Sequence, residues 1–126
     1  MLSASHNRAY QDFLALLTDL KKSVDNSAIL SSRTLVSSEF PSLQQWFERN
    51  IVPLNTKDLE PSIVARWQSI QTEIAREFKL LSTDTSFLAS ARHNGTQIKR
   101  LKSISDRLTK LIGYCQILLD NCEVES

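Results

Sequence analysis

Hydrophobic side chains recur at helical spacing in four segments of the chain, and the pattern is clearest toward the C-terminal end. Over residues 97–122 they fall three or four positions apart, which is the period of one helix face. Residues 62–91 repeat the pattern, with Thr85 in one slot. The two stripes consist of Ile98, Leu101, Ile104, Leu108, Leu111, Cys115, Leu118 and Cys122, and of Ile63, Trp67, Ile70, Ile74, Phe78, Leu81 and Leu88. This spacing predicts two long helices.

The two predicted helices are joined by the short polar segment 92–96. Asn94 and Gly95 both tolerate a positive φ, so we expect them to stop the first helix. Thr96 is then placed to cap the returning helix by accepting a hydrogen bond from a backbone N–H of its first turn. A connection this short forces the helices to run antiparallel, with stripe facing stripe.

The N-terminal part of the chain predicts two shorter helices. The first covers about residues 5–23, and its stripe consists of Tyr10, Phe13, Leu14, Leu17, Leu20 and Val24. Residues 28–54 also keep helical spacing, but Pro41 interrupts them. Proline suits the first turn of a helix and bends or breaks its interior, so either a helix begins near residue 40 or a longer helix is kinked there. We favour a main helix over 39–51, ended with the help of Pro53.

The remaining capping and turn-forming residues are consistent with an all-α fold. Residues 55–58 offer capping side chains for the third helix, and Pro61 fits its first turn. The small polar residues 82–86 are poor helix formers, so a local bend is expected there, and 123–126 are expected to be a frayed tail. Two glycines and three prolines leave little room for the turns of many strands. The chain is therefore predicted to be a single domain over 1–126, an antiparallel four-helix bundle with a long C-terminal hairpin.

Charge is nearly balanced overall, at a net +1, but it is unevenly distributed. Residues 92–110 hold a single acid, Asp106, against six bases, and no other stretch is so one-sided. The bases are Arg92, Lys99, Arg100, Lys102, Arg107 and Lys110. Three interpretations stay open: a solvated helix face, a docking surface for an acidic protein, or a nucleic-acid site. The near-neutral total charge and the lack of aromatic residues among these bases argue against nucleic acid.

The search for catalytic chemistry is largely negative, and no enzyme, metal or cofactor is expected. His6 falls near an end expected to be mobile, and His93 falls in the predicted turn. The alternative function is a histidine-phosphotransfer or sensor-associated helical bundle, with His93 as the candidate histidine, or a weak nucleic-acid binder. No Cys/His spacing resembles a zinc site, and no glycine-rich phosphate loop is present. Glu73 and Glu77, one turn apart, are interpreted as a solvated pair.

Cysteine usage and hydropathy favour a cytoplasmic protein. Cys115 and Cys122 are seven residues apart on one predicted helix, about 10.5 Å along its axis, and cannot bridge each other. They are expected to be buried thiols in a reducing compartment. The opening residues lack the pattern of a signal peptide, and no stretch has the length of a membrane span.

Several hydrophobic residues lie off the predicted stripes, and they have two interpretations. They are Leu16, Trp46, Leu80, Tyr114 and Ile117. A wide stripe covered by neighbouring helices would account for them, and so would contact with a partner or a second copy.

Four runs of the sequence resemble the cyanobacterial heterocyst frequency control protein (PatD) family. They are the opening Tyr10-Gln-Asp-Phe-Leu, the segment Pro41 to Leu54 (PSLQQWFERNIVPL), Leu59 to Ile74 (LEPSIVARWQSIQTEI) and Asp106 to Leu119 (DRLTKLIGYCQILL). The resemblance spans most of the chain and implies a cytoplasmic, non-enzymatic regulator. Such proteins bind the tubulin-like division protein FtsZ, promote its assembly and influence how often vegetative cells become heterocysts. No site residues are carried over from the family, so the six bases above are contact candidates on charge alone.

Overall fold

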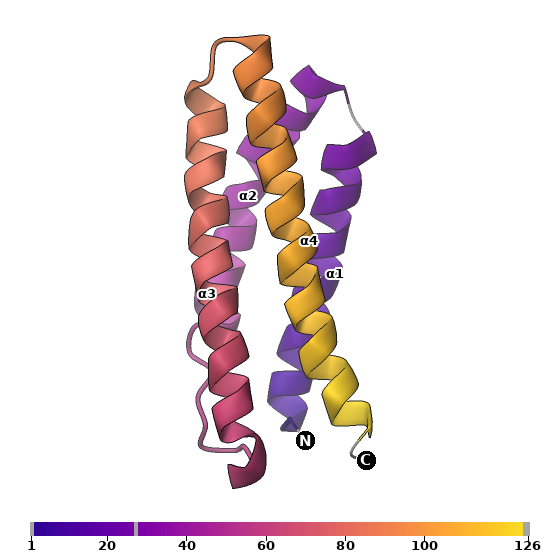
Figure 1. Cartoon of the computed structure of the whole chain (residues 1–126), viewed down its shortest axis with the longest axis vertical. Helices are drawn as coiled ribbons and strands as arrows, with labels where there is room; N and C mark the ends of the chain where they lie inside the picture. The colour runs from indigo at the N-terminus through magenta and orange to yellow at the C-terminus, as the bar shows by residue number, and fades with distance from the viewer. Residues whose placement is uncertain (1, 27, 125–126) are drawn as a thin grey trace.

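The computed structural model describes residues 2–26 and 28–124, which form four helices in an antiparallel bundle (Figure 1). The helices are α1 (Ala4–Asn26), α2 (Ile29–Asn50), α3 (Pro61–Ser90) and α4 (Asn94–Val124). Helix α4 packs along both α3 and α1, and α2 closes the remaining side. No strand occurs in the described part of the chain. The predicted all-α bundle with two long C-terminal helices is confirmed.

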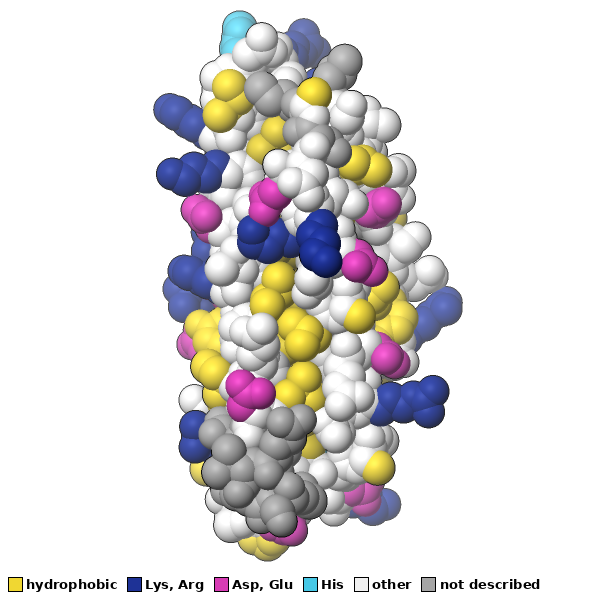
Figure 2. Space-filling view, turned by 90° about the vertical axis from the view of Figure 1, so that its right-hand side faces the viewer, with side chains coloured by type: hydrophobic (Ala, Val, Ile, Leu, Met, Phe, Trp, Pro, Cys, Tyr) yellow, Lys and Arg dark blue, Asp and Glu magenta, His cyan; other side chains and the backbone are white. Residues whose placement is uncertain are grey.

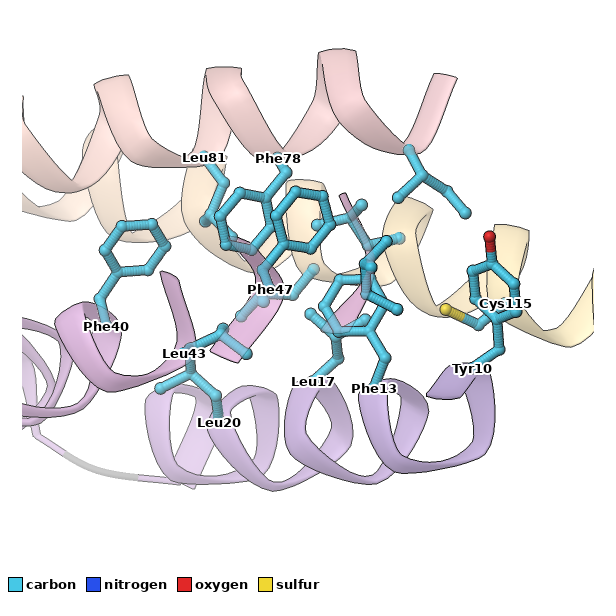
Figure 3. Close-up of a cluster of buried hydrophobic side chains, with 14 of the residues drawn as sticks. Tyr10, Phe13, Leu17, Leu20, Phe40, Leu43, Phe47, Phe78, Leu81 and Cys115 are labelled. Atoms are coloured by element: carbon cyan, nitrogen blue, oxygen red, sulfur yellow. The ribbon is translucent and has the colours of Figure 1, made fainter. Parts of the chain in front are cut away.

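The core is built from the predicted stripes and is centred on aromatic rings (Figure 3). Phe47 of α2 stacks on Phe78 of α3 with ring centroids 3.9 Å apart and planes within 5°. Phe40 and Phe13 lie against the same Phe78 ring at 5.6 and 6.2 Å. Because three helices contribute rings to one cluster, the stripes cannot be buried separately, and their burial ties the bundle together.

A chain of hydrogen bonds fixes α1, α3 and the end of α2 inside this core. The indole Nε1 of Trp67 donates to the hydroxyl of Tyr10 at 2.9 Å, and that hydroxyl donates to Gln71. The amide of Gln71 donates in turn to the carbonyl of Ile51 at 3.2 Å. Burial raises the pKa of Tyr10 far above its ordinary value, so the hydroxyl keeps its proton.

His6 is buried, with 3% of its surface exposed, and the expectation of a mobile N-terminal position for it is wrong. Its Nε2 lies 2.9 Å from the carbonyl oxygen of Asn55, and its Nδ1 lies 2.6 Å from the hydroxyl of Ser3. Because a carbonyl only accepts, Nε2 carries the proton. The ring also meets Trp67 edge-on at 5.4 Å, so the start of α1 is fixed to the α2–α3 connection.

Helix α2 is one continuous element, so the predicted main helix over 39–51 is too short. Pro41 lies inside the helix and removes one backbone hydrogen bond. Pro41 and Ser37, whose carbonyl loses its helical partner, are both exposed, so water can satisfy that carbonyl. Val36 and Leu43 are buried on either side of the proline, and their packing offsets the local penalty.

The start of α3 differs from the predicted capping. Helix α3 begins at Pro61, as expected, but Glu60 precedes it without a side-chain cap. Asn55 instead accepts a hydrogen bond from the N–H of Lys57 at 2.9 Å and so stabilises the turn before the helix.

Residues 82–86 do not interrupt α3, which runs continuously from Pro61 to Ser90. Thr83 and Thr85 donate their hydroxyl protons back to the carbonyls of Lys79 and Ser82 at 3.1 and 2.8 Å. These bonds satisfy the hydroxyl protons inside the helix while its backbone continues through the segment.

The α3–α4 connection is shorter than predicted and is limited to residues 91–93. Asn94 and Gly95 begin α4 instead of ending α3, no described glycine has a positive φ, and Thr96 lies inside the helix. The side chain of Gln97 is buried and donates to the carbonyl of Ala91 at 3.0 Å. Gln97 thus replaces Ile98 on the buried face, and Ile98 is 50% exposed.

The far end of α4 confirms one of the two thiol predictions. Cys115 is fully buried in the core. The side chain of Cys122 lies outside the described residues. Helix α4 extends to Val124, two residues beyond its predicted end at 122, and residues 125–126 lie outside the description.

Candidate docking surface on the α3–α4 hairpin

The six predicted contact bases lie on or beside α4, and the structure divides them into two sets. Arg100, Arg107 and Lys110 turn toward α3 and pair with two of its carboxylates, those of Glu77 and Asp84. These five residues are called the ion-pair ladder below. Arg92, Lys99 and Lys102 are exposed and are called the outer cations.

The ion-pair ladder joins α3 to α4 along two helical turns. Arg107 donates to Glu77 at 3.1 Å through Nη1 and to Asp84 at 3.4 Å through Nε. Arg100 Nη1 reaches the other oxygen of Asp84 at 3.4 Å, and Lys110 Nζ lies 3.5 Å from Glu77. Each carboxylate therefore meets two cations, and Arg107 links the two pairs into one network.

Burial of the carboxylates makes this network structural. The side chains of Glu77 and Asp84 are only 5% and 9% exposed, so the interpretation of Glu77 as a solvated residue is wrong. An unpaired carboxylate at such a depth would lose its hydration without compensation. Burial lowers the pKa of Arg107, but its bonds to Glu77 and Asp84 outweigh that effect and raise the pKa above its ordinary value. The ladder therefore ties α3 to α4, and two carboxylates of the same chain partly neutralise its three cations.

The paired residues of the ladder occupy symmetric positions in the sequence. Asp84 and Arg100 are 16 residues apart, Glu77 and Arg107 are 30 apart, and both pairs are centred on Arg92. In an antiparallel hairpin, residues equally distant from the turn lie opposite each other. Acids and bases at equal distances on either side of residue 92 therefore identify the ladder, whereas the charge pattern of one helix alone does not.

Arg100 makes a second contact that removes it further from the docking candidates. Its guanidinium carbon lies 4.4 Å from the centre of the Phe87 ring, a cation–π arrangement. Phe87 is 48% exposed, and the guanidinium covers part of what would otherwise be bare aromatic surface.

The outer cations keep their charge at the surface near the closed end of the hairpin. Arg92 lies in the connection, and Lys99 and Lys102 are one turn apart on α4. Within residues 2–26 and 28–124, none of the three has a carboxylate within ion-pair distance. Figure 2 shows Lys and Arg side chains projecting along the upper left edge of its face. Three of the six predicted bases thus remain candidates for meeting a partner.

The other chemical candidates are separate from one another. His93 is exposed in the α3–α4 connection rather than on a helix face, and Glu73 pairs with Arg76 at 3.5 Å on the outside of α3. In the part of the chain that the structure describes, no group of three or more His, Cys, Asp or Glu side chains could hold a metal ion.

Off-stripe hydrophobic residues divide between partial burial and exposure. Trp46, Leu80 and Tyr114 are half-buried, as the wide-stripe interpretation predicts. Leu16 and Ile117 are 38% and 43% exposed. Single exposed aliphatic residues are normal on protein surfaces, so contact with a partner stays a prediction for these two positions.

Comparison with known proteins adds no relative. The chain matches no protein-family model, no curated protein and no solved structure. None of the described helices combines the length and the apolar character needed to cross a membrane.

Proposed function

We propose that this chain is a cytoplasmic, non-enzymatic interaction protein that binds FtsZ through the outer cations and promotes its assembly, thereby affecting heterocyst frequency. The sequence resemblance described above suggests the partner. One structural observation supports the surface: Arg92, Lys99 and Lys102 remain unneutralised while the other three bases are paired within the hairpin. Clustered cations of this kind accelerate encounter with an acidic surface.

The mechanism is electrostatic docking of a rigid rod. The ion-pair ladder keeps α3 and α4 in fixed register, so the outer cations are presented in a constant arrangement. Bound to an acidic face of an FtsZ filament, they would reduce repulsion between subunits or between filaments. Bundling requires two contacts per particle, supplied by two surfaces of one bundle or by two copies.

Co-sedimentation of FtsZ with and without the protein tests the role. The wild-type protein is expected to increase the pelleted polymer and to bundle it. A Lys99→Glu/Lys102→Glu variant is expected to bind about tenfold more weakly, with the loss growing at low salt. Arg100 is left unchanged, because its reversal would disturb Asp84 as well.

The matched control is Lys57→Glu/Arg66→Glu, which makes the same change in net charge at exposed positions near the opposite end. It should retain wild-type activity. Unchanged polymer mass and bundling with the wild-type protein would reject the role. Full activity of Lys99→Glu/Lys102→Glu would reject the site and leave the role standing.

A further inference from the structure

A groove of about 460 Å³ lies between α1 and α2, on a different side of the bundle from the ion-pair ladder. Its lining mixes apolar, acidic and hydroxyl side chains: Leu16, Asp19, Leu20, Ser38, Glu39, Ser42, Leu43 and Trp46. Leu20 and Leu43 belong to the core, whereas Leu16 is exposed and Trp46 is half-buried. The groove therefore exposes aliphatic and aromatic surface that the bundle itself does not cover.

Two carboxylates give this groove a negative charge. Asp19 and Glu39 are both exposed, and neither has an ion-pair partner among the described residues. This contrasts with Glu77 and Asp84, whose charges are fully used inside the chain. A ligand that fits the groove must combine an apolar side chain with neighbouring cations.

The same chain presents such a surface on α4. Ile98 is 50% exposed, and Lys102 lies four residues further along, which places both on one side of the helix. Lys99 is three residues before Lys102 and borders the same surface. We call Ile98, Lys99 and Lys102 the α4 face. Its chemistry is the complement of the groove: an aliphatic side chain flanked by unneutralised cations.

We infer that a second copy of this chain docks its α4 face into the α1–α2 groove. Ile98 of one copy would cover Leu16 and Trp46 of the next, with Lys99 and Lys102 close to Asp19 and Glu39. The two surfaces differ, so the contact is head-to-tail and leaves a free groove at one end of an open chain and a free α4 face at the other. Pairing groove with groove is disfavoured, because it would bring the acids of both copies together.

The inference does not depend on FtsZ, although docking would occupy two of the three outer cations. It concerns the purified protein alone, so its failure is separate from failure of the proposed function. The proposed contact consists of one aliphatic side chain and two cations against the groove, and small interfaces associate weakly. We therefore expect the contact to appear between about 10 μM and 1 mM protein.

Sedimentation velocity over that range provides the first test. The average mass of the wild-type protein should rise with concentration and fall again at 1 M salt, where charges are screened beyond about 3 Å. Asp19→Lys/Glu39→Lys and Lys99→Glu/Lys102→Glu should each associate about tenfold more weakly by themselves. An equimolar mixture of the two variants should recover association, because each offers the surface that the other has reversed.

Disulfide trapping provides the second test, in a Cys122→Ser background where the remaining thiol, Cys115, is buried. Mild oxidation of Leu16→Cys mixed with Ile98→Cys should give about tenfold more cross-linked dimer than Leu16→Cys mixed with Val52→Cys, because docking raises the effective concentration of the thiols. Val52 is an exposed control position at 58%. A monomer at every concentration, or equal trapping in both mixtures, would overturn the inference and leave the groove to a segment of another protein.

Discussion

Arg107 Nη1 lies 3.1 Å from Oε2 of Glu77, and this pair joins the two longest helices, α3 and α4. Because Arg107 also reaches Asp84, one guanidinium compensates two carboxylates that are almost wholly removed from water. The same contact that stabilises the hairpin takes Arg107 out of the candidate docking surface.

Replacing Arg107 with Ala should therefore destabilise the protein more than replacing any of the outer cations with Ala. The substitution leaves Glu77 with Lys110 alone and Asp84 with Arg100 alone, so each buried carboxylate loses one of its two cations. We expect the free energy of unfolding to fall by about 2–3 kcal/mol. Lys99→Ala, at an exposed position, should stay within about 0.5 kcal/mol of the wild type. Urea unfolding at neutral pH measures both variants, and equal effects would contradict a structural role for the ladder.

Pro41→Ala should stabilise the protein. The substitution restores a backbone N–H inside α2 and removes the proline ring from the helix interior, at the expense of a more flexible unfolded chain. The expected net gain is about 1–2 kcal/mol in the free energy of unfolding. Pro61→Ala is the control, because Pro61 occupies the first turn of α3, where proline is well suited and no gain is expected. Thermal unfolding of both variants measures the change in stability. A less stable Pro41→Ala variant would contradict the prediction and show that the proline ring packs favourably.

Asp25 should contribute to stability at neutral pH and cease to do so in acid. A hydrogen bond from Lys21 lowers the pKa of Asp25 below its ordinary value of 3.8, and a second one from Ser105, at 2.8 Å, acts in the same direction. A folded-state pKa below the unfolded one gives stability that is present above pH 3.8 and is lost as the pH falls through the folded-state value. Asp25→Asn should thus be less stable than the wild type at pH 7, with the difference vanishing below the folded pKa. A difference independent of pH would assign the effect to packing.

Cys115 should resist thiol reagents in the folded protein. Burial raises the pKa of its thiol from 9.0 to about 12, and the thiolate is the reactive form. In a Cys122→Ser variant, labelling by a disulfide reagent at pH 8 should be at least about 10³-fold slower than in urea, because it requires unfolding. Rapid labelling without denaturant would mean that the core opens locally around α4.

The periodic part of the sequence was sufficient to predict the bundle. Hydrophobic residues spaced three and four positions apart form one face of a helix, and four such helices bury these faces against one another. Phe13, Phe47 and Phe78 contact one another as this pattern predicts. Local rules failed where tertiary packing or water overrode them. Pro41 lies within α2, at a point where Pro41 and Ser37 are both exposed to water. Gln97 replaces Ile98 on the buried face because its amide reaches the carbonyl of Ala91.

The candidate site was only half predictable, because the charge pattern of one helix does not show which of its bases face the acids of the neighbouring helix. Arg100 and Arg107 look identical to Lys99 and Lys102 in a count of bases, yet the first two face the acids of α3 and the last two face outward. Their difference depends on the register of the hairpin. The burial of His6 could not be predicted for a related reason. Its hydrogen-bond acceptor is a backbone carbonyl 49 residues away, and the pattern of side chains does not show such a partner.

The two tryptophans of this chain have very different surroundings. Trp67 is 5% exposed and donates to Tyr10 in the interior, whereas Trp46 lies half-buried in the lining of the α1–α2 groove. Indole fluorescence shifts to shorter wavelengths when water leaves the ring, so a molecule settling in the groove would change the emission of Trp46 and leave that of Trp67 constant. A Trp67→Phe protein would thus carry a built-in optical sensor that reads the occupancy of this groove without any added label.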